Sequence, residues 1–110
     1  MSIETVVESY FAAIRARDID SLLALYMEDA TVTIPSGKEF RGTAAIGEMQ
    51  RGVFAGAAPI PTIVNKVLGA NAAAVEIEAR LADGSVRRTA NFYQLSPAGR
   101  IARLSVYMRS

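Results

Sequence analysis

The sequence of 110 residues contains no cysteine, no histidine and no tryptophan. Without cysteine there is neither a disulfide framework nor thiolate chemistry. Without histidine, a zinc or haem site is not expected, and proton transfer near neutral pH must fall to carboxylates or phenols. We therefore expect a protein with no metal and no cofactor.

A strong charge of either sign and a long apolar run are also missing. Twelve basic and eleven acidic residues give a formal net charge of +1, which provides no electrostatic footprint for nucleic acid. No apolar run approaches the roughly 20 residues that cross a bilayer, and the N-terminus lacks a signal-peptide pattern. With 51% hydrophobic residues the chain can build one core. We expect a single cytoplasmic domain over residues 1–110, with no nucleic-acid or membrane partner.

The first half of the chain shows the apolar period of helices. A first helix is predicted from its cap at Ser2, with an apolar stripe at Ile3, Val6, Val7, Tyr10, Phe11 and Ile14. A second, short helix begins after Asp18 or Asp20, dissolves at Glu28, and carries Leu22, Leu23, Leu25 and Tyr26. A third begins at its cap Thr43, ends at Gly56, and carries Ile46, Met49, Val53 and Phe54 on one side.

Strand patterns fill the rest of the sequence. Residues 30–35 form a short β-branched strand that residues 38–42 pair with as a small hairpin. Four longer strands are expected at about 60–68, 72–82, 86–95 and 101–108, with reversals at Asp83-Gly84 and residues 96–100. This order predicts an α+β fold in which three helices from the N-terminal half cover a curved antiparallel sheet. A strongly curved sheet and its covering helices form a cone, and the interior of this cone is a pocket suited to an apolar small molecule.

The last two strands have faces of mixed polarity. Asn91 shares one face with Arg87, Thr89, Tyr93 and Leu95, so a polar amide is expected to point into an enclosed space. On the last strand, Leu104 and Val106 share a face. The opposite faces of the two strands carry Ala90, Phe92, Gln94, Ile101, Arg103, Ser105 and Tyr107. This mixture suits a self-complementary interface, and we expect a homodimer through the outer face of the sheet.

Several segments resemble the bacterial ketosteroid isomerases, of the SnoaL-like branch of the nuclear-transport-factor-2-like superfamily. The similar segments are Val6-Val7-Glu8-Ser9-Tyr10-Phe11-Ala12-Ala13-Ile14, Arg17-Asp18-Ile19-Asp20, Tyr26-Met27-Glu28-Asp29-Ala30-Thr31-Val32, Gly42-Thr43-Ala44-Ala45-Ile46 and the final hairpin from Asn91 to Met108. The resemblance covers essentially the whole chain. It implies the cystatin-like, cone-shaped fold of that superfamily.

The resemblance also implies roles for individual residues. In the family, an aspartate base moves a proton beside a carbonyl, while a tyrosine and a protonated aspartic acid donate hydrogen bonds to the enolate oxygen. Tyr10 is similar to that tyrosine, and Asn91 stands at the position of the aspartic acid, where an amide can also donate. At the position of the base, before Pro35, stands Ile34, which cannot accept a proton. Steroid isomerisation by the family mechanism is therefore not expected.

We accordingly expect a pocket that binds a small, hydrophobic, oxygen-bearing ligand through Tyr10 and Asn91. Its further ligand-binding residues are expected to be Tyr26, Ile34, Gln50, Phe54, Tyr93, Leu104 and Val106. Arg87, if it lies at the mouth of the cone, could meet an anionic substituent, although a solvated strand edge is the simpler interpretation.

Two other functions stay open from the sequence alone. One is an active SnoaL-like cyclase, dehydratase or hydrolase with an unidentified base, which would need a carboxylate in the pocket. Glu39 is the carboxylate nearest in sequence to the missing base. The other is a non-enzymatic, dimeric association module, whose pocket would be filled by its own side chains and whose sheet would expose an apolar face.

Overall fold

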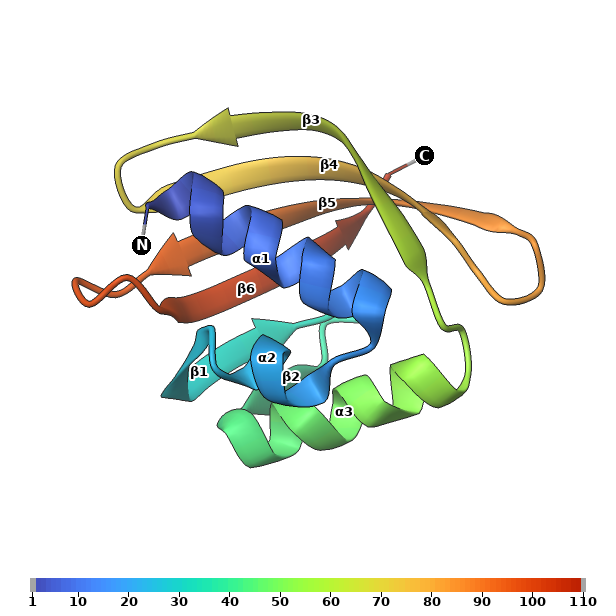
Figure 1. The fold of residues 1–110 in the computed structure, drawn as a ribbon, viewed down its shortest axis with the longest axis horizontal. Coiled ribbons are helices and arrows are strands. Elements are labelled where there is room, and N and C mark those ends of the chain that lie inside the picture. The colour runs from blue at the N-terminus through green and yellow to red at the C-terminus, as the bar shows by residue number, and fades with distance from the viewer. Residues whose placement is uncertain (1, 110) are drawn as a thin grey trace.

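The computed structural model describes residues 2–109, which form three helices and one six-stranded sheet (Figure 1). The helices are α1 (Ile3–Ala16), α2 (Ile19–Leu23) and α3 (Thr43–Ala55). The strands are β1 (Tyr26–Thr33), β2 (Glu39–Arg41), β3 (Ile60–Leu68), β4 (Ala72–Arg80), β5 (Val86–Leu95) and β6 (Ile101–Met108). The predicted α+β fold is confirmed.

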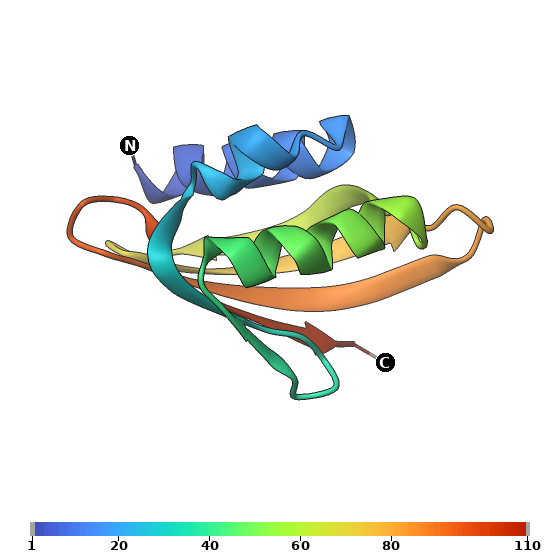
Figure 2. The same ribbon diagram turned by 90° about the horizontal axis from the view of Figure 1, so that it is seen from below.

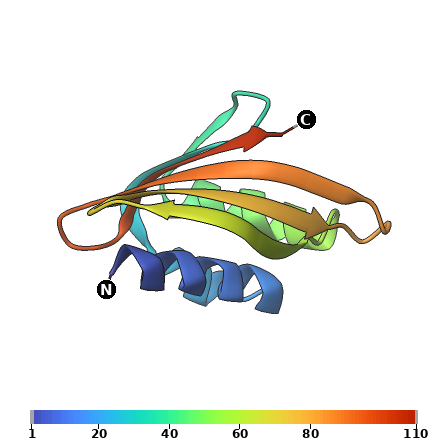
Figure 3. The ribbon, with the colours of Figure 1, turned by 90° about the horizontal axis from the view of Figure 1, so that it is seen from above.

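The sheet has the strand order β2-β1-β6-β5-β4-β3. Every neighbouring pair is antiparallel except β1 and β6, which are parallel. The three helices all lie on one side of the curved sheet (Figures 2 and 3), with α1 near β3 and β4, and α3 near β1 and β2. Within residues 2–109, no helix is both long enough and apolar enough to cross a membrane.

The helix starts follow two different rules. Ser2 caps α1 as predicted, because its Oγ accepts a hydrogen bond from the Thr5 backbone nitrogen at 3.2 Å. Asp18 caps α2 in the same way through Ser21. The prediction that Thr43 caps α3 was wrong: the N-cap is Gly42, with φ +87° and no side-chain cap. The backbone nitrogen of Gly42 donates a hydrogen bond to the carbonyl oxygen of Ala30 at 2.8 Å. The positive φ of Gly42 is a left-handed backbone conformation, which favours glycine.

The second predicted helix was too long. α2 ends at Leu23, and Tyr26 already belongs to β1, where it pairs in parallel with Ile101 of β6. The apolar run of residues 22–26 satisfies helix and strand patterns equally well. Pairing with a strand that lies far along the chain therefore decides the outcome, and no local pattern records it.

A β-bulge changes the start of β6. Gln94 faces Arg103 and Leu95 faces Ile101, so Ala102 is one extra residue on β6. The prediction that Ile101 lies on the outer face was wrong, because the bulge turns this side chain inward and leaves it 0% exposed. Arg103, Ser105 and Tyr107 remain on the outer face as predicted.

Candidate ligand-binding site

A pocket of about 260 Å³ lies between the helices and the sheet face that they cover. Its wall is mainly apolar, and both predicted oxygen-binding residues line it: Tyr10 from α1 and Asn91 from β5. Five of the seven other predicted ligand-binding residues line it too, namely Tyr26, Ile34, Gln50, Leu104 and Val106. The fold thus gathers residues from α1, β1, α3, β5 and β6 around one space.

Two predicted residues lie outside this lining. Phe54 is half-buried near the end of α3 and packs against the core. Tyr93 is buried behind the pocket wall, where its ring packs edge-to-face on Tyr10 with centroids 5.3 Å apart. A second edge-to-face contact joins Phe11 to Tyr10 at 4.9 Å. The Tyr10 ring is therefore held from two sides, which fixes where its hydroxyl can reach.

Burial keeps the phenol of Tyr10 protonated. Its pKa is raised to about 12, because removal from water disfavours the phenolate, and a hydrogen bond with Tyr26 offsets part of this rise. Burial raises the pKa of Tyr26 and of Tyr93 well above the ordinary value, and the nearby Tyr10 adds to both shifts. At neutral pH all three are uncharged, so Tyr10 is available as a hydrogen-bond donor.

The amide of Asn91 is oriented by its neighbours on β5. The Thr89 hydroxyl donates to Asn91 Oδ1 at 3.3 Å, and Asn91 Nδ2 donates to the Tyr93 hydroxyl at 3.1 Å. Asn91 and Thr89 are both buried. An amide nitrogen carries two hydrogens, so one N–H of Asn91 remains for a ligand after the bond to Tyr93.

The position that the resemblance assigns to the family's base is apolar. Ile34 follows β1 and lines the pocket beside Val32 and Pro35. Within residues 2–109 no aspartate or glutamate lines the pocket, and Arg87 is its one charged residue. Glu39 is exposed on β2 and is not part of the lining. In the same residues, no group of three histidine, cysteine, aspartate or glutamate side chains is placed to hold a metal ion.

Some lining residues were not singled out from the sequence. Ile77 and Ala79 of β4 enter the wall because they face Thr89 and Arg87 across the β4–β5 hairpin. Their alternation with charged residues placed them on an apolar face, and the register set by the Asp83-Gly84 turn would have placed them beside Arg87. The signal was therefore available, but it required the hairpin register as well as the pattern.

Three solved structures superimpose on nearly the whole chain. A protein of unknown function with a cystatin-like fold from Methylobium petroleophilum PM1 gives a TM-score of 0.87 at 24% identity, covering 97% of this chain and 75% of that one. A proposed ketosteroid isomerase from Kribbella flavida DSM 17836 gives 0.86 at 18% identity, with 96% and 76% covered. The epoxide hydrolase/cyclase-like enzyme SalBIII, of pyran ring formation in the polyether salinomycin, gives 0.84 at 22% identity, with 96% and 89% covered.

At identities below 25%, these likenesses show the fold alone, and they confirm the cystatin-like architecture predicted from the sequence. A family model adds evidence of descent, because the SnoaL-like domain matches residues 7–104. That span includes Tyr10, Ile34 and Asn91. The resemblance stated from the sequence is thereby confirmed, and this chain belongs to the SnoaL-like domain family.

Proposed function

We propose that this protein binds a small hydrophobic molecule and holds a carbonyl or phenolic oxygen of that molecule between Tyr10 and Asn91. One observation carries the proposal: two neutral donors, from α1 and β5, line the same largely apolar pocket. The donors are fixed in advance, Tyr10 by its ring contacts and Asn91 by Thr89 and Tyr93. Preorganised donors of this kind favour an oxygen that carries partial or full negative charge.

The chemistry proposed for the pocket is polarisation of the bound oxygen, without the proton transfer that the family's aspartate performs. Ile34 replaces that aspartate and gives the ligand an apolar contact. A carbonyl held by two donors becomes a better electrophile, but hydrogen bonds alone do not move a proton between carbon atoms. Binding, rather than isomerisation, is the activity for which the pocket carries the groups.

The size of the pocket limits the ligand. Pockets for drug-sized molecules have volumes of roughly 300–1,000 Å³, and this one measures about 260 Å³. We therefore propose a ligand with one or two rings inside the pocket, rather than an enclosed four-ring steroid.

The test is a fluorescence titration with 2-naphthol, a two-ring phenol. Tyr10→Phe removes one donor and should weaken binding by about 1–2 kcal/mol, or roughly 5- to 30-fold in Kd. Tyr107→Phe is the matched control, because this tyrosine is exposed on the opposite face of the sheet. Equal affinities of Tyr10→Phe and wild type would remove Tyr10 from the site, and no saturable binding by wild type would overturn the proposed function.

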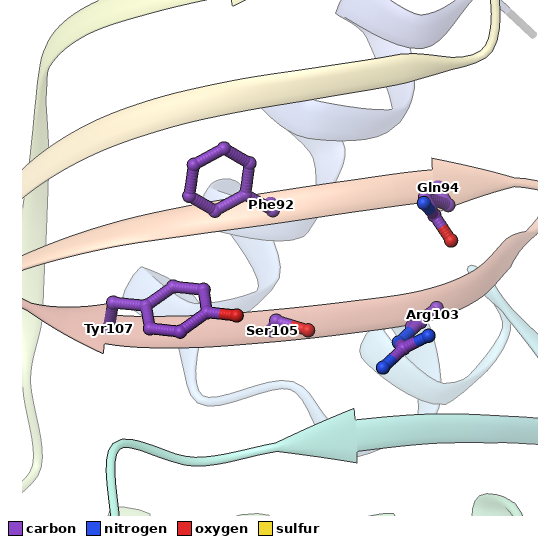
Figure 4. Close-up of a pocket in the computed structure, with 5 residues that line it drawn as sticks. All are labelled: Phe92, Gln94, Arg103, Ser105 and Tyr107. Atoms are coloured by element: carbon purple, nitrogen blue, oxygen red, sulfur yellow. The ribbon is translucent and has the colours of Figure 1, made fainter.

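We further propose that the outer face of the sheet pairs with a second copy of the chain. A hollow of about 500 Å³ on this face is lined by Phe92 and Gln94 of β5 and by Arg103, Ser105 and Tyr107 of β6 (Figure 4). Phe92 and Tyr107 are 48% and 56% exposed, and their rings pack edge-to-face with centroids 5.6 Å apart. An exposed aromatic pair with a polar rim is typical of the centre of a protein interface.

Charge supports a second copy as the occupant. Arg103 lies beyond Phe92 toward one end of the strands, and among the described residues it forms no ion pair. Glu78 lies toward the other end, on β4, where its Oε2 pairs with Arg88 of the same chain and its Oε1 makes no hydrogen bond among the described residues. A two-fold axis that runs across the strands near Phe92 would reverse the strand direction of the second copy. The end of each copy that carries Arg103 would then lie over the end of the other copy that carries Glu78.

Light scattering at micromolar concentration tests this interface. The wild type should have the mass of a dimer, and Phe92→Glu should have that of a monomer. Val64→Glu is the control, because Val64 is similarly exposed but lies at a bulge in β3, outside the hollow. A monomeric wild type would contradict the proposal, and so would a Phe92→Glu variant that remains a dimer.

A further inference from the structure

Among residues 2–109, the one charged side chain of the pocket wall is a cation that forms no ion pair. Arg87 lies on the same face of β5 as Thr89 and Asn91, and all three line the pocket. Arg87 is exposed whereas the other two are buried, which places it toward the open end of the pocket. Among residues 2–109, its guanidinium makes neither an ion pair within 4 Å nor a hydrogen bond.

The neighbouring charged groups are engaged elsewhere. Asp83, in the β4–β5 turn, accepts hydrogen bonds from the backbone nitrogen of Ser85 at 2.9 Å and from its hydroxyl. These bonds are the main cause of the lowered pKa of Asp83, and Arg87 contributes least to it. Arg88 points to the opposite face and pairs with Glu78 at 2.8 Å. Across the hairpin, Arg87 faces Ala79, whose methyl group offers no counter-charge.

We infer that the natural ligand carries a carboxylate that pairs with Arg87, in addition to the oxygen held by Tyr10 and Asn91. This inference rests on the proposed function, and it narrows the ligand to one- or two-ring hydroxy or oxo acids. A guanidinium presents two parallel N–H groups that match the two oxygens of a carboxylate. A single arginine, with no second cation in the described lining, suits one negative charge better than the double charge of a phosphate monoester.

The test compares 2-naphthol with three hydroxynaphthoic acids that carry the carboxylate at different ring positions. The isomers sample different spacings between the hydroxyl and the carboxylate, so a poor fit of one isomer does not decide the result. The measured quantity is the ratio of the Kd of 2-naphthol to that of the best-binding acid. For the wild type we expect a preference for the acid of about two- to fivefold, the modest value for a solvent-exposed ion pair. This preference should shrink in high salt.

Arg87→Gln should abolish the preference for the acid. Arg88→Gln is the matched control, because it removes the same charge from the adjacent residue on the opposite face, and it should keep the preference. Tyr10→Phe should weaken both probes by a similar factor.

The outcomes separate the two proposals. If 2-naphthol binds and depends on Tyr10 but no acid binds more tightly, the inference about the carboxylate is wrong and the proposed function stands. A preference for the acid that survives in Arg87→Gln would also overturn the inference. If 2-naphthol does not bind at all, the proposed function itself fails.

Discussion

Replacing Ile34 by aspartate tests whether the pocket lacks only a base. The variant would place a carboxylate at the position that the resemblance assigns to the family's base, in a wall shared with Val32 and Pro35. The substrate should fit a pocket of about 260 Å³, so 3-cyclohexen-1-one is preferable to a steroid. Transfer of a proton from carbon 2 to carbon 4 of this ketone gives the conjugated 2-cyclohexen-1-one, whose ultraviolet absorbance reports the reaction.

The cost in stability can be estimated from the surroundings of Ile34. This side chain is half-buried and packs against the core, so losing its apolar contacts should cost about 1–2 kcal/mol. Partial desolvation should raise the pKa of the new carboxyl above its ordinary value near 3.9, and each unit of that rise costs about 1.4 kcal/mol when the group is ionised. Arg87 attracts the carboxylate and limits the rise. We expect a total loss of about 2–3 kcal/mol in the free energy of unfolding at pH 8.

The pH dependence separates the two contributions. A carboxyl whose pKa is raised in the folded state binds more protons when folded than when unfolded. The ionisation penalty is therefore absent at pH values below the unfolded pKa and grows as the pH rises through the folded pKa. Ile34→Asn is the matched control, since it removes the same apolar contacts but cannot titrate.

Urea unfolding at about pH 3.5 and at pH 8 and the rate of ketone isomerisation are the two measurements. Ile34→Asp should lose more stability than Ile34→Asn at the higher pH, and it should isomerise 3-cyclohexen-1-one faster than both Ile34→Asn and the wild type. Identical pH profiles of the two variants would show that position 34 is solvated rather than part of an apolar wall. A stable aspartate variant that binds the ketone without accelerating the reaction would show that the donors and the base are not aligned.

Three further predictions concern stability. The pKa of Tyr10 is about 12 in the folded protein and near 10 when unfolded, so its contribution is complete below pH 10 and is lost as the pH rises toward 12. Tyr10→Phe should therefore show a shallower alkaline loss of stability than the wild type in urea titrations, by up to about 2–3 kcal/mol, and equal slopes would contradict the burial of this phenol. Gly42→Ala should destabilise the protein by about 1 kcal/mol or more, because the φ of Gly42 is +87°. Gly52→Ala, in an open part of α3, should stabilise it by about 0.5–1 kcal/mol. Thermal unfolding measures both changes, and the opposite order of stabilities would refute the conformational argument. Arg109→Met should cost about 1–3 kcal/mol, since its guanidinium donates to backbone carbonyls of β4 and β5 and to a carboxylate, and a loss no larger than that of Arg88→Met would show that these bonds contribute little.

Sequence reasoning places a pocket residue most securely where the period of a single helix or strand fixes the direction of its side chain. Tyr10 lies on a helical stripe and Asn91 on an alternating strand, and each period alone points its side chain to the helix–sheet interior. Both residues line the pocket, as the combination of period and family resemblance predicted. Tyr93 shows the limit of that reasoning. It lies on the same face as Asn91, but packing against Tyr10 and Phe11 places it behind the wall.

Errors occurred where the outcome depends on contacts far apart in the chain. Tyr26 was expected in a helix and lies in a strand because β6, some seventy-five residues later, pairs with it. Ile101 was expected outside and is buried because one extra residue in β6 reverses its direction. A bulge has no reliable sequence signal in a strand whose faces are both of mixed polarity. Local patterns therefore give the kind of element more securely than its register.

The charges of the pocket relate two departures from the family pattern, at positions 34 and 91, to the ligand that we propose. The resemblance places an aspartate base at position 34 and an aspartic acid at position 91, whereas this chain has isoleucine and asparagine there. Isoleucine removes the negative charge of a base, whereas asparagine is neutral, as the protonated aspartic acid is, and the charge in the described lining is the cation of Arg87. An aspartate at position 34 would repel a ligand carboxylate within the same small space, so a base there and an anionic ligand oppose each other electrostatically. The proposed pairing of a ligand carboxylate with Arg87 therefore requires a residue at position 34 that carries no negative charge, and isoleucine meets this requirement.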